Sequence, residues 1–182
     1  MGVYILIVII VFLLLYCLIT YNSLVKKRNV VKEAFSTMDV YLKKRWDLVP
    51  NLVEIVKGYT KHEQESFERI TKLRSASYDS LTTNNKIDVN EQMTKEISNI
   101  IAVSEKYPEL KASQNYLDLS NQLTKIEDEI ANSRKYYNGA VRILNDKIQV
   151  FPSNIVANIF GFKEANMFEA EVNAKDNIEV NL

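Results

Sequence analysis

The chain has 182 residues, and its 23 lysines and arginines balance 23 aspartates and glutamates, so it carries no formal net charge. This balance argues against the strongly basic surface that nucleic-acid binding requires, and we expect no nucleic-acid partner. One cysteine excludes an intrachain disulfide, and four glycines with three prolines favour long helices over a β-sandwich or barrel.

An uncharged apolar run extends from Val3 to Ile19, and the first charged side chain is Lys26. About 20 helical residues, at 1.5 Å each, cross a hydrocarbon core of roughly 30 Å. No basic side chain precedes the run and no small-residue cleavage site follows it, which distinguishes it from a cleaved signal peptide. We therefore predict an uncleaved transmembrane helix over residues 1–21.

Basic residues flank only the C-terminal side of the span. They are Lys26, Lys27, Arg28 and Lys32. Because basic flanks stay in the cytoplasm, we predict a single-pass protein with its N-terminus outside and its large domain inside.

Two long amphipathic helices are predicted after the span, over residues 21–57 and 113–149. Their apolar side chains recur at steps of three and four, which is the spacing of one helix face. The first is expected to continue from the span without a linker and to bend at Pro50, which cannot donate to the previous turn. A chain reversal is not expected there, since the apolar stripe keeps its phase. Gly58 then stands where a helix commonly ends.

Two shorter helices are predicted between them, over residues 60–77 and 88–107. A polar stretch at residues 79–85 has little to bury and is expected to be a mobile loop. Thr60 and Glu63 form a capping-box pattern that starts the first short helix.

The predicted fold class is all-α, with the N-terminal transmembrane helix followed by an up-and-down four-helix bundle over residues 22–150 and coiled-coil-like contacts. In this topology the last helix returns toward the membrane, so asparagines spaced one heptad apart on the two long helices can form buried polar layers. The alternative is that they are ordinary surface residues. The candidate polar layer comprises Asn22, Arg28, Asn29, Asn138 and Asn145.

A short amphipathic helix is predicted over residues 151–162, with Ser153 as its N-cap and Gly161 at its end. Its apolar residues can enter the membrane interface or fold as a lid over the open end of the bundle, and both alternatives stay open. These contact residues are Ile155, Ile159, Phe160 and Phe162. Residues 163–182 are predicted to be a polar, extended tail.

No residue pattern indicates catalysis, a metal site or a cofactor. His62 is the only histidine, and a zinc-protease motif would need a second one four residues later. The carboxylates Glu127, Asp128 and Glu129 are expected to lie on a helix surface, and the basic cluster Lys43-Lys44-Arg45 is expected to face water. The protein is therefore predicted not to be an enzyme.

Several motifs in order along the chain closely resemble the LemA family. They are Tyr21-Asn22-x-Leu24-Val25-x-x-Arg28-Asn29-x-Val31, Ala34-Phe35-Ser36-x-Met38-Asp39-Val40-x-Leu42-Lys43-Lys44-Arg45, Asp47-Leu48-Val49-Pro50-Asn51-Leu52-Val53-Glu54, Lys57-Gly58-Tyr59, Tyr107-Pro108-Glu109-Leu110-Lys111-Ala112, Arg134-x-x-Tyr137-Asn138, Phe151-Pro152-Ser153-Asn154-Ile155 and Phe160-Gly161-Phe162. This resemblance implies a helical-bundle protein of the bacterial cell membrane, without enzymatic activity or cofactor. It also hints at a membrane-embedded zinc metalloprotease of the HtpX type as a partner, and at magnetosome membrane formation.

Two functions are consistent with these observations. The first is a membrane-anchored scaffold or adaptor that binds or assembles with another membrane protein, or with further copies of itself. The second is a membrane-shaping or lipid-sensing protein that uses the C-terminal amphipathic helix against the lipid bilayer.

Overall fold

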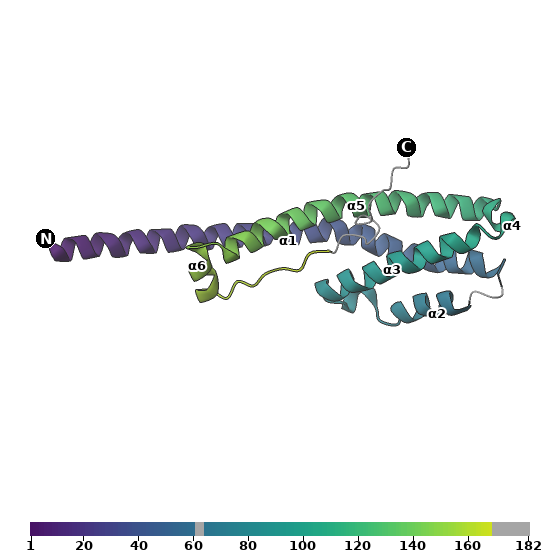
Figure 1. The fold of residues 1–182 in the computed structure, drawn as a ribbon, viewed down its shortest axis with the longest axis horizontal. Helices are drawn as coiled ribbons and strands as arrows, with labels where there is room; N and C mark the ends of the chain where they lie inside the picture. The colour runs from purple at the N-terminus through teal and green to yellow at the C-terminus, as the bar shows by residue number, and fades with distance from the viewer. Residues whose placement is uncertain (61–63, 169–182) are drawn as a thin grey trace, which may run out of the picture. The chain divides into compact units, whose positions relative to one another are not determined.

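The computed structural model describes residues 1–60 and 64–168. Within these ranges all regular secondary structure is helical (Figure 1), which confirms the all-α fold with an N-terminal transmembrane helix. The elements are α1 (Gly2–Lys57), α2 (Gln64–Leu73), the short 3₁₀-helix η1 (Tyr78–Ser80), α3 (Thr83–Ser104), α4 (Pro108–Lys111), α5 (Gln114–Gln149) and α6 (Ser153–Ile159). His62, and Glu63 of the expected capping box, lie outside the described residues.

The chain divides into two compact units. One contains residues 1–32 together with the chain from Tyr136 onward, and the other contains residues 33–135. The long helices α1 and α5 each contribute to both units, because each continues past a unit boundary. Helix α1 runs without interruption from Gly2 through Pro50 to Lys57.

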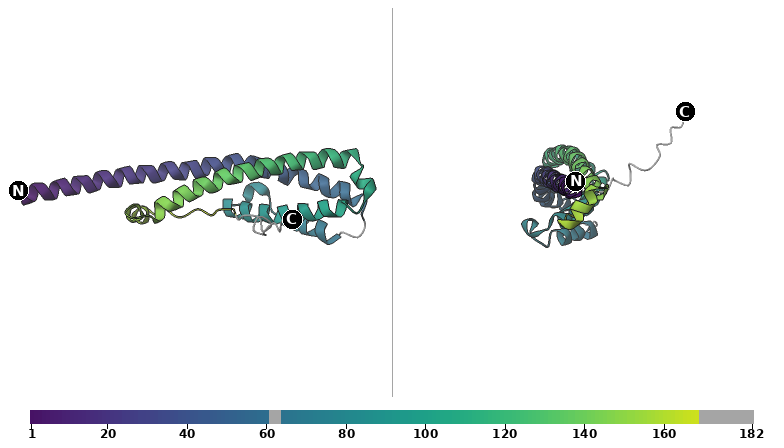
Figure 2. Two further views of the ribbon diagram at one scale, coloured as in Figure 1. Left: turned by 45° about the horizontal axis from the view of Figure 1, so that its top comes forward. Right: turned by 90° about the vertical axis from the view of Figure 1, so that its left-hand side faces the viewer.

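The unit of residues 33–135 is a bundle of four helical segments that alternate in direction, from α1, α2, α3 and α5 (Figures 1 and 2). The part of α1 in this bundle buries a stripe at alternating steps of four and three, which is a heptad seam. Six residues on this seam are fully buried: Met38, Leu42, Arg45, Val49, Leu52 and Val56.

The segment between α2 and α3 differs from the predicted mobile loop. Tyr78, at the start of η1, is 3% exposed, and its ring lies 5.2 Å from that of Trp46 on α1. Its hydroxyl donates a hydrogen bond of 2.6 Å to Asp39, which also accepts from Lys86. Helix α3 begins at Thr83, five residues before the predicted start, because the Thr82 hydroxyl caps it by accepting from the amide of Asn85.

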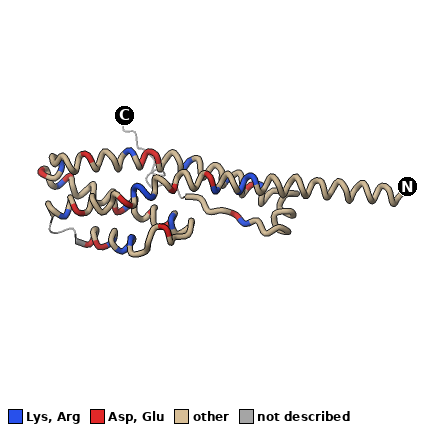
Figure 3. Tube along the Cα trace, turned by 180° about the vertical axis from the view of Figure 1, so that it is seen from behind, with Lys and Arg blue, Asp and Glu red and all other residues tan. Residues whose placement is uncertain are grey.

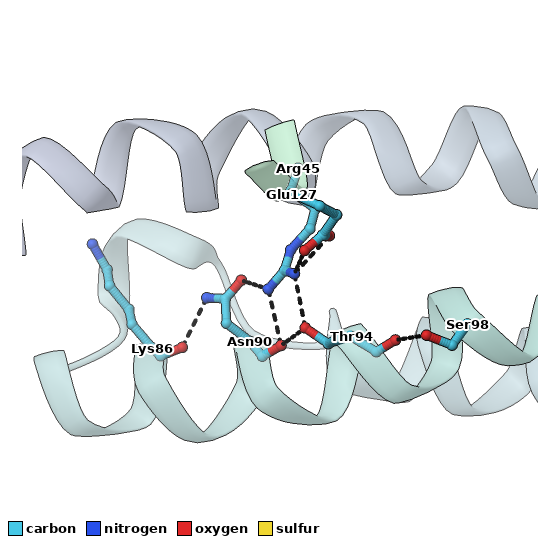
Figure 4. A network of polar contacts seen from close by, with 6 residues as sticks. All are labelled: Arg45, Lys86, Asn90, Thr94, Ser98 and Glu127. Atoms are coloured by element: carbon cyan, nitrogen blue, oxygen red, sulfur yellow. Dashed lines mark hydrogen bonds and ion pairs between the residues drawn. The ribbon is translucent and has the colours of Figure 1, made fainter. Parts of the chain in front are cut away.

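A buried arginine joins three helices of the bundle (Figure 4). Arg45 on α1 is fully buried, and its Nη1 donates to both carboxylate oxygens of Glu127 on α5, at 2.7 and 2.9 Å. Nη1 also donates to Thr94, and Nη2 donates to the side chain and the backbone carbonyl of Asn90, both on α3. Such paired and hydrogen-bonded burial is what makes a charge tolerable in a core.

The expectation that Arg45 faces water is therefore wrong, and so is the expectation that Glu127 is merely a surface carboxylate. Glu127 lies at the edge of the bundle, with its side chain 33% exposed, whereas its neighbours Asp128 and Glu129 are exposed. Lys43 and Lys44 are not part of the buried stripe. The missed signal is the position of Arg45 on the heptad seam, three residues after Leu42.

Burial raises the pKa of the Tyr78 hydroxyl above its ordinary value, and the hydrogen bond to Asp39 and the charge of that carboxylate raise it further. A tyrosine whose pKa is higher in the folded chain stabilises the fold below the unfolded value of about 10 and loses this contribution as the pH rises. We expect the free energy of unfolding to fall more steeply above about pH 10 in the native protein than in Tyr78→Phe. Denaturant titrations of both proteins at a series of pH values measure the difference, and identical slopes would contradict this account.

Candidate functional site

The candidate site lies where α1 leaves its apolar segment, in the unit of residues 1–32 and 136–168. From Val3 to Leu15 the side chains of α1 are exposed, with Phe12 at 70% and Leu15 at 52%. No charged residue interrupts this stretch (Figure 3), and α1 is the one helix among the described residues that is long and apolar enough to cross a membrane. Lipid is the environment that makes such exposure favourable.

Protein begins to cover α1 just before the predicted end of the span. Tyr16 and Cys17 are half-buried and Thr20 is 2% exposed, whereas Ile19 still faces outward at 69%. The cover comes from the end of α5 and from α6, which lies beside α1 (Figure 2).

Aromatic contacts hold the C-terminal part of the chain against α1. The Tyr21 ring lies 4.8 Å from that of Phe160 and 5.8 Å from that of Phe162. The Arg28 guanidinium lies over the Phe162 ring at 5.3 Å, as a cation–π contact. These contacts place the end of α6 within two helical turns of the apolar segment of α1.

Helix α6 has a buried face and an exposed apolar face. Val156 and Ala157 are buried, and they attach the helix to its unit. The other apolar side chains in and beside α6 are exposed: Val150 at 58%, Phe151 at 75%, Ile155 at 50%, Ile159 at 70% and Phe160 at 51%. Of the four predicted contact residues, Phe162 is half-buried and Phe160 contacts the Tyr21 ring, whereas Ile155 and Ile159 are at least half exposed.

The ends of α6 agree only in part with the sequence interpretation. Ser153 is not an N-cap, because it is buried and its hydroxyl lies 2.7 Å from the carbonyl of Lys147 and 2.8 Å from that of Val150, to which it donates. It therefore ties α6 to the last turn of α5, whose terminal carbonyls need donors. Gly161 does end the helix in the left-handed region, with φ of +68°.

An extended strap, residues 162–168, follows α6 and runs back along α5 (Figures 1 and 2). The side-chain amide of Asn145 donates to the carbonyl of Ala165 and accepts from its backbone N–H, at 2.9 and 3.0 Å. Asn138 makes the same pair of bonds with Phe168, both at 3.0 Å. Seven helical residues rise about 10.5 Å, and three extended residues span about 10 Å, so the two spacings match.

Phe168 anchors the far end of the strap. It is 2% exposed and meets the Tyr137 ring edge-on at 5.8 Å, and the Tyr137 hydroxyl donates to the carbonyl of Asn166. Burial raises the pKa of Tyr137 above its ordinary value. Residues 163–168 are thus part of a folded unit, in contrast to the predicted polar tail, whose remainder lies outside the described residues.

The candidate polar layer is not assembled as predicted. Asn138 and Asn145 bind the backbone of the strap, while Asn22 and Asn29 are exposed. Arg28 is exposed as well and contacts Phe162. The physical reason is that each of these half-buried amides finds two backbone partners in the strap, a donor and an acceptor on the same residue, which satisfy both ends of the amide group.

We expect Asn138→Leu to destabilise the protein by about 1–3 kcal/mol, because it leaves the N–H and the carbonyl of Phe168 without partners. Asn29→Leu is the matched control and should change stability by less than about 0.5 kcal/mol, since Asn29 is exposed. Thermal melting of the detergent-solubilised full chain, followed by circular dichroism, compares them. Equal melting temperatures would show that the strap contributes nothing.

The chain's family follows from its sequence. A family model described as the LemA family matches residues 34–182. The chain belongs to the LemA family. Protein LemA of Metamycoplasma hominis is 28% identical over 150 residues, which cover 82% of this chain and 68% of that protein. Magnetosome protein MamQ 2 of Paramagnetospirillum magneticum is 24% identical over 178 residues, which cover 84% of this chain and 65% of that protein.

The chain therefore spans about two-thirds of the length of these two relatives. The segment that the family model matches, residues 34–182, includes most of the bundle, α6 and the strap. In this LemA-family chain, residues 1–60 and 64–168 contain no group of three or more histidines, cysteines, aspartates or glutamates that could hold a metal ion.

Proposed function

We propose that this protein is a membrane-anchored helical scaffold that binds or assembles with another membrane protein and catalyses no reaction itself. The observation that carries the proposal is the continuity of α1, which is one helix from the lipid-exposed segment into the bundle. A partner bound to the bundle is thereby tethered to the bilayer. The relatives named above, Protein LemA and Magnetosome protein MamQ, bear names that specify no reaction.

Isolated apolar side chains on the bundle surface provide positions at which a partner can be captured. Val40 on α1 is 53% exposed and Leu117 on α5 is 40% exposed. Single exposed apolar residues are common and do not define an interface by themselves, so they serve here as positions for a probe.

A photo-crosslinking amino acid at Val40 or Leu117, in the full chain and in intact membranes, tests the scaffold. We expect discrete crosslinked bands that mass spectrometry identifies as membrane proteins, with an HtpX-type metalloprotease as the candidate partner. A band at twice the chain mass would indicate a homo-oligomer. The same probe at the exposed Lys125 is the control. Monomers alone at both apolar positions would refute the proposal.

The proposed orientation places the bundle in the cytoplasm of a bacterial cell, with the N-terminus outside. The basic residues that follow the span support it. Cys17 is the only cysteine, so Cys17→Ser combined with Asn121→Cys gives a single exposed thiol on α5. A membrane-impermeant maleimide should label this thiol only after the cells are lysed, and labelling of intact cells would reverse the orientation.

A second candidate function is lipid sensing or membrane shaping by α6. The exposed Phe151, Ile159 and Phe160 favour it, because they belong to the unit that contains the span and lie near its end. An environment-sensitive fluorophore on Ile159→Cys, in the Cys17→Ser background, should shift to shorter wavelength when the protein enters liposomes. The exposed Glu164→Cys in the strap is the control. Equal spectra in detergent and in liposomes would remove this function.

A further inference from the structure

A surface groove of about 300 Å³ lies between α1 and the last turn of α5. Tyr16, Val150 and Phe151 give it apolar lining, whereas Lys27, Asp146 and Lys147 give it charged lining. All six belong to the unit that carries the transmembrane span.

The groove is aligned with the span. Tyr16 and Lys27 are eleven residues apart on α1, which corresponds to about 16 Å along the helix axis. About 5 Å of this length, from Tyr16 to Ile19, lies within the apolar run, and the rest lies beyond it. Because Tyr16 precedes the end of the apolar run and Lys27 follows it, the groove extends from acyl-chain depth to the level of lipid headgroups.

The charged end of the groove favours an anion. Lys27 and Lys147 are half-buried, and neither forms an ion pair with any residue in the described part of the chain. Asp146 also lines the groove, but it is exposed, so two positive charges face one negative charge. A lysine ammonium binds phosphate as a point charge and needs no fixed geometry.

The apolar end favours a ligand with an acyl chain. Val150 is 58% exposed and Phe151 is 75% exposed, next to the half-buried Tyr16. A free phosphate ion would leave this surface uncovered, whereas an acyl chain would bury it and gain roughly 25 cal/mol for each Å².

We infer that this groove is a binding site for an anionic phospholipid, with the phosphate at Lys27 and Lys147 and an acyl chain against Tyr16, Val150 and Phe151. The inference rests on the proposed membrane placement of α1, but it does not require a protein partner. It assigns a ligand to the junction between α1 and α5. It also gives a role to Lys27, which the sequence analysis uses only as an orientation signal, and to Lys147, which the sequence analysis does not use.

The test uses the purified full chain in a neutral detergent, with phosphatidylglycerol and phosphatidylcholine of identical acyl chains as probes. Native mass spectrometry counts the lipids that each chain retains, and thermal melting gives an independent measure of binding. We expect phosphatidylglycerol to be retained preferentially and to raise the melting temperature. Lys27→Gln and Lys147→Gln should each weaken its binding about fivefold, the effect of one basic residue near an anionic surface.

Lys26→Gln and Lys32→Gln are the matched controls, because both lysines are exposed on α1 and do not line the groove. They should leave phosphatidylglycerol binding unchanged, and Phe151→Ser should weaken the binding of both lipids. Equal losses in groove and control variants would overturn the site in favour of general surface attraction. Displacement of the lipid by millimolar inorganic phosphate would overturn it in favour of a free-anion site.

The result is separable from the scaffold test. Crosslinked partners without lipid preference would leave the scaffold standing and remove only the groove as a lipid site. Lipid preference without crosslinked partners would leave the lipid site standing and remove the scaffold.

Discussion

Replacing Glu127 with leucine is expected to lower the free energy of unfolding by about 3–5 kcal/mol, because it leaves a buried guanidinium without a counter-charge. Arg45 is fully buried, whereas the side chain of Glu127 is 33% exposed, so the cost falls on the arginine. The remaining partners of Arg45, Asn90 and Thr94, are neutral and cannot compensate the charge.

Two matched variants make this prediction specific. Glu129→Leu removes the same side chain from an exposed position two residues away and should change stability by less than about 0.5 kcal/mol. Adding Arg45→Met to Glu127→Leu should recover part of the loss, since an apolar pair often replaces a buried ion pair at little cost. Chemical denaturation of the detergent-solubilised chain measures all of them. The single variant Arg45→Met completes the comparison. If the double variant lost as much stability as Glu127→Leu and Arg45→Met lose in sum, the two residues would not interact.

Phe168→Ala is expected to destabilise the protein by about 3–5 kcal/mol, the usual cost of truncating a buried phenylalanine. Phe168 is 2% exposed and meets the Tyr137 ring edge-on, so its loss leaves a cavity at the end of the strap. Met167→Ala is the control, because Met167 is adjacent in sequence and 42% exposed, and its loss should cost less than about 0.5 kcal/mol.

Hydrogen exchange gives Phe168→Ala a second readout. The backbone N–H groups of Ala165 and Phe168 donate hydrogen bonds to Asn145 and Asn138. If Phe168 holds the strap in place, these bonds open more often in the variant, and at least the Ala165 amide proton should exchange faster. Unchanged exchange together with a lower melting temperature would show that Phe168 supports α5 but does not hold the strap.

The parts of the fold with regular periodicity could be predicted from the sequence. The bounds of α1 and α5 fall within about one residue of the predicted ends, because long heptad patterns constrain both. The start of α3 could not be placed as well. The capping hydroxyl of Thr82 and the burial of Tyr78 decide it. The cap is a local contact with Asn85, whereas the burial of Tyr78 depends on Asp39 and Trp46, which are distant in sequence.

The candidate site was predicted only in outline. The spacing of the apolar residues predicts α6, but the polar, aperiodic composition of the strap predicts an extended tail. The strap binds α5 through backbone atoms and through the single buried side chain of Phe168, and neither forms a repeating pattern in the sequence. The burial of Arg45 is missed for a different reason. Two adjacent lysines make the segment resemble a solvent-exposed basic cluster and obscure the position of Arg45 on the heptad seam.

The amide pairs of Asn138 and Asn145 contact main-chain atoms of the strap and not its side chains. The amino acids between Phe162 and Phe168 can therefore be substituted without loss of these bonds, provided that their number is preserved. A single inserted or deleted residue between Ala165 and Phe168 would shift one of these two residues by about 3.4 Å relative to its asparagine and break both of its hydrogen bonds. The number of residues in this segment therefore matters more for its attachment to α5 than their identity does.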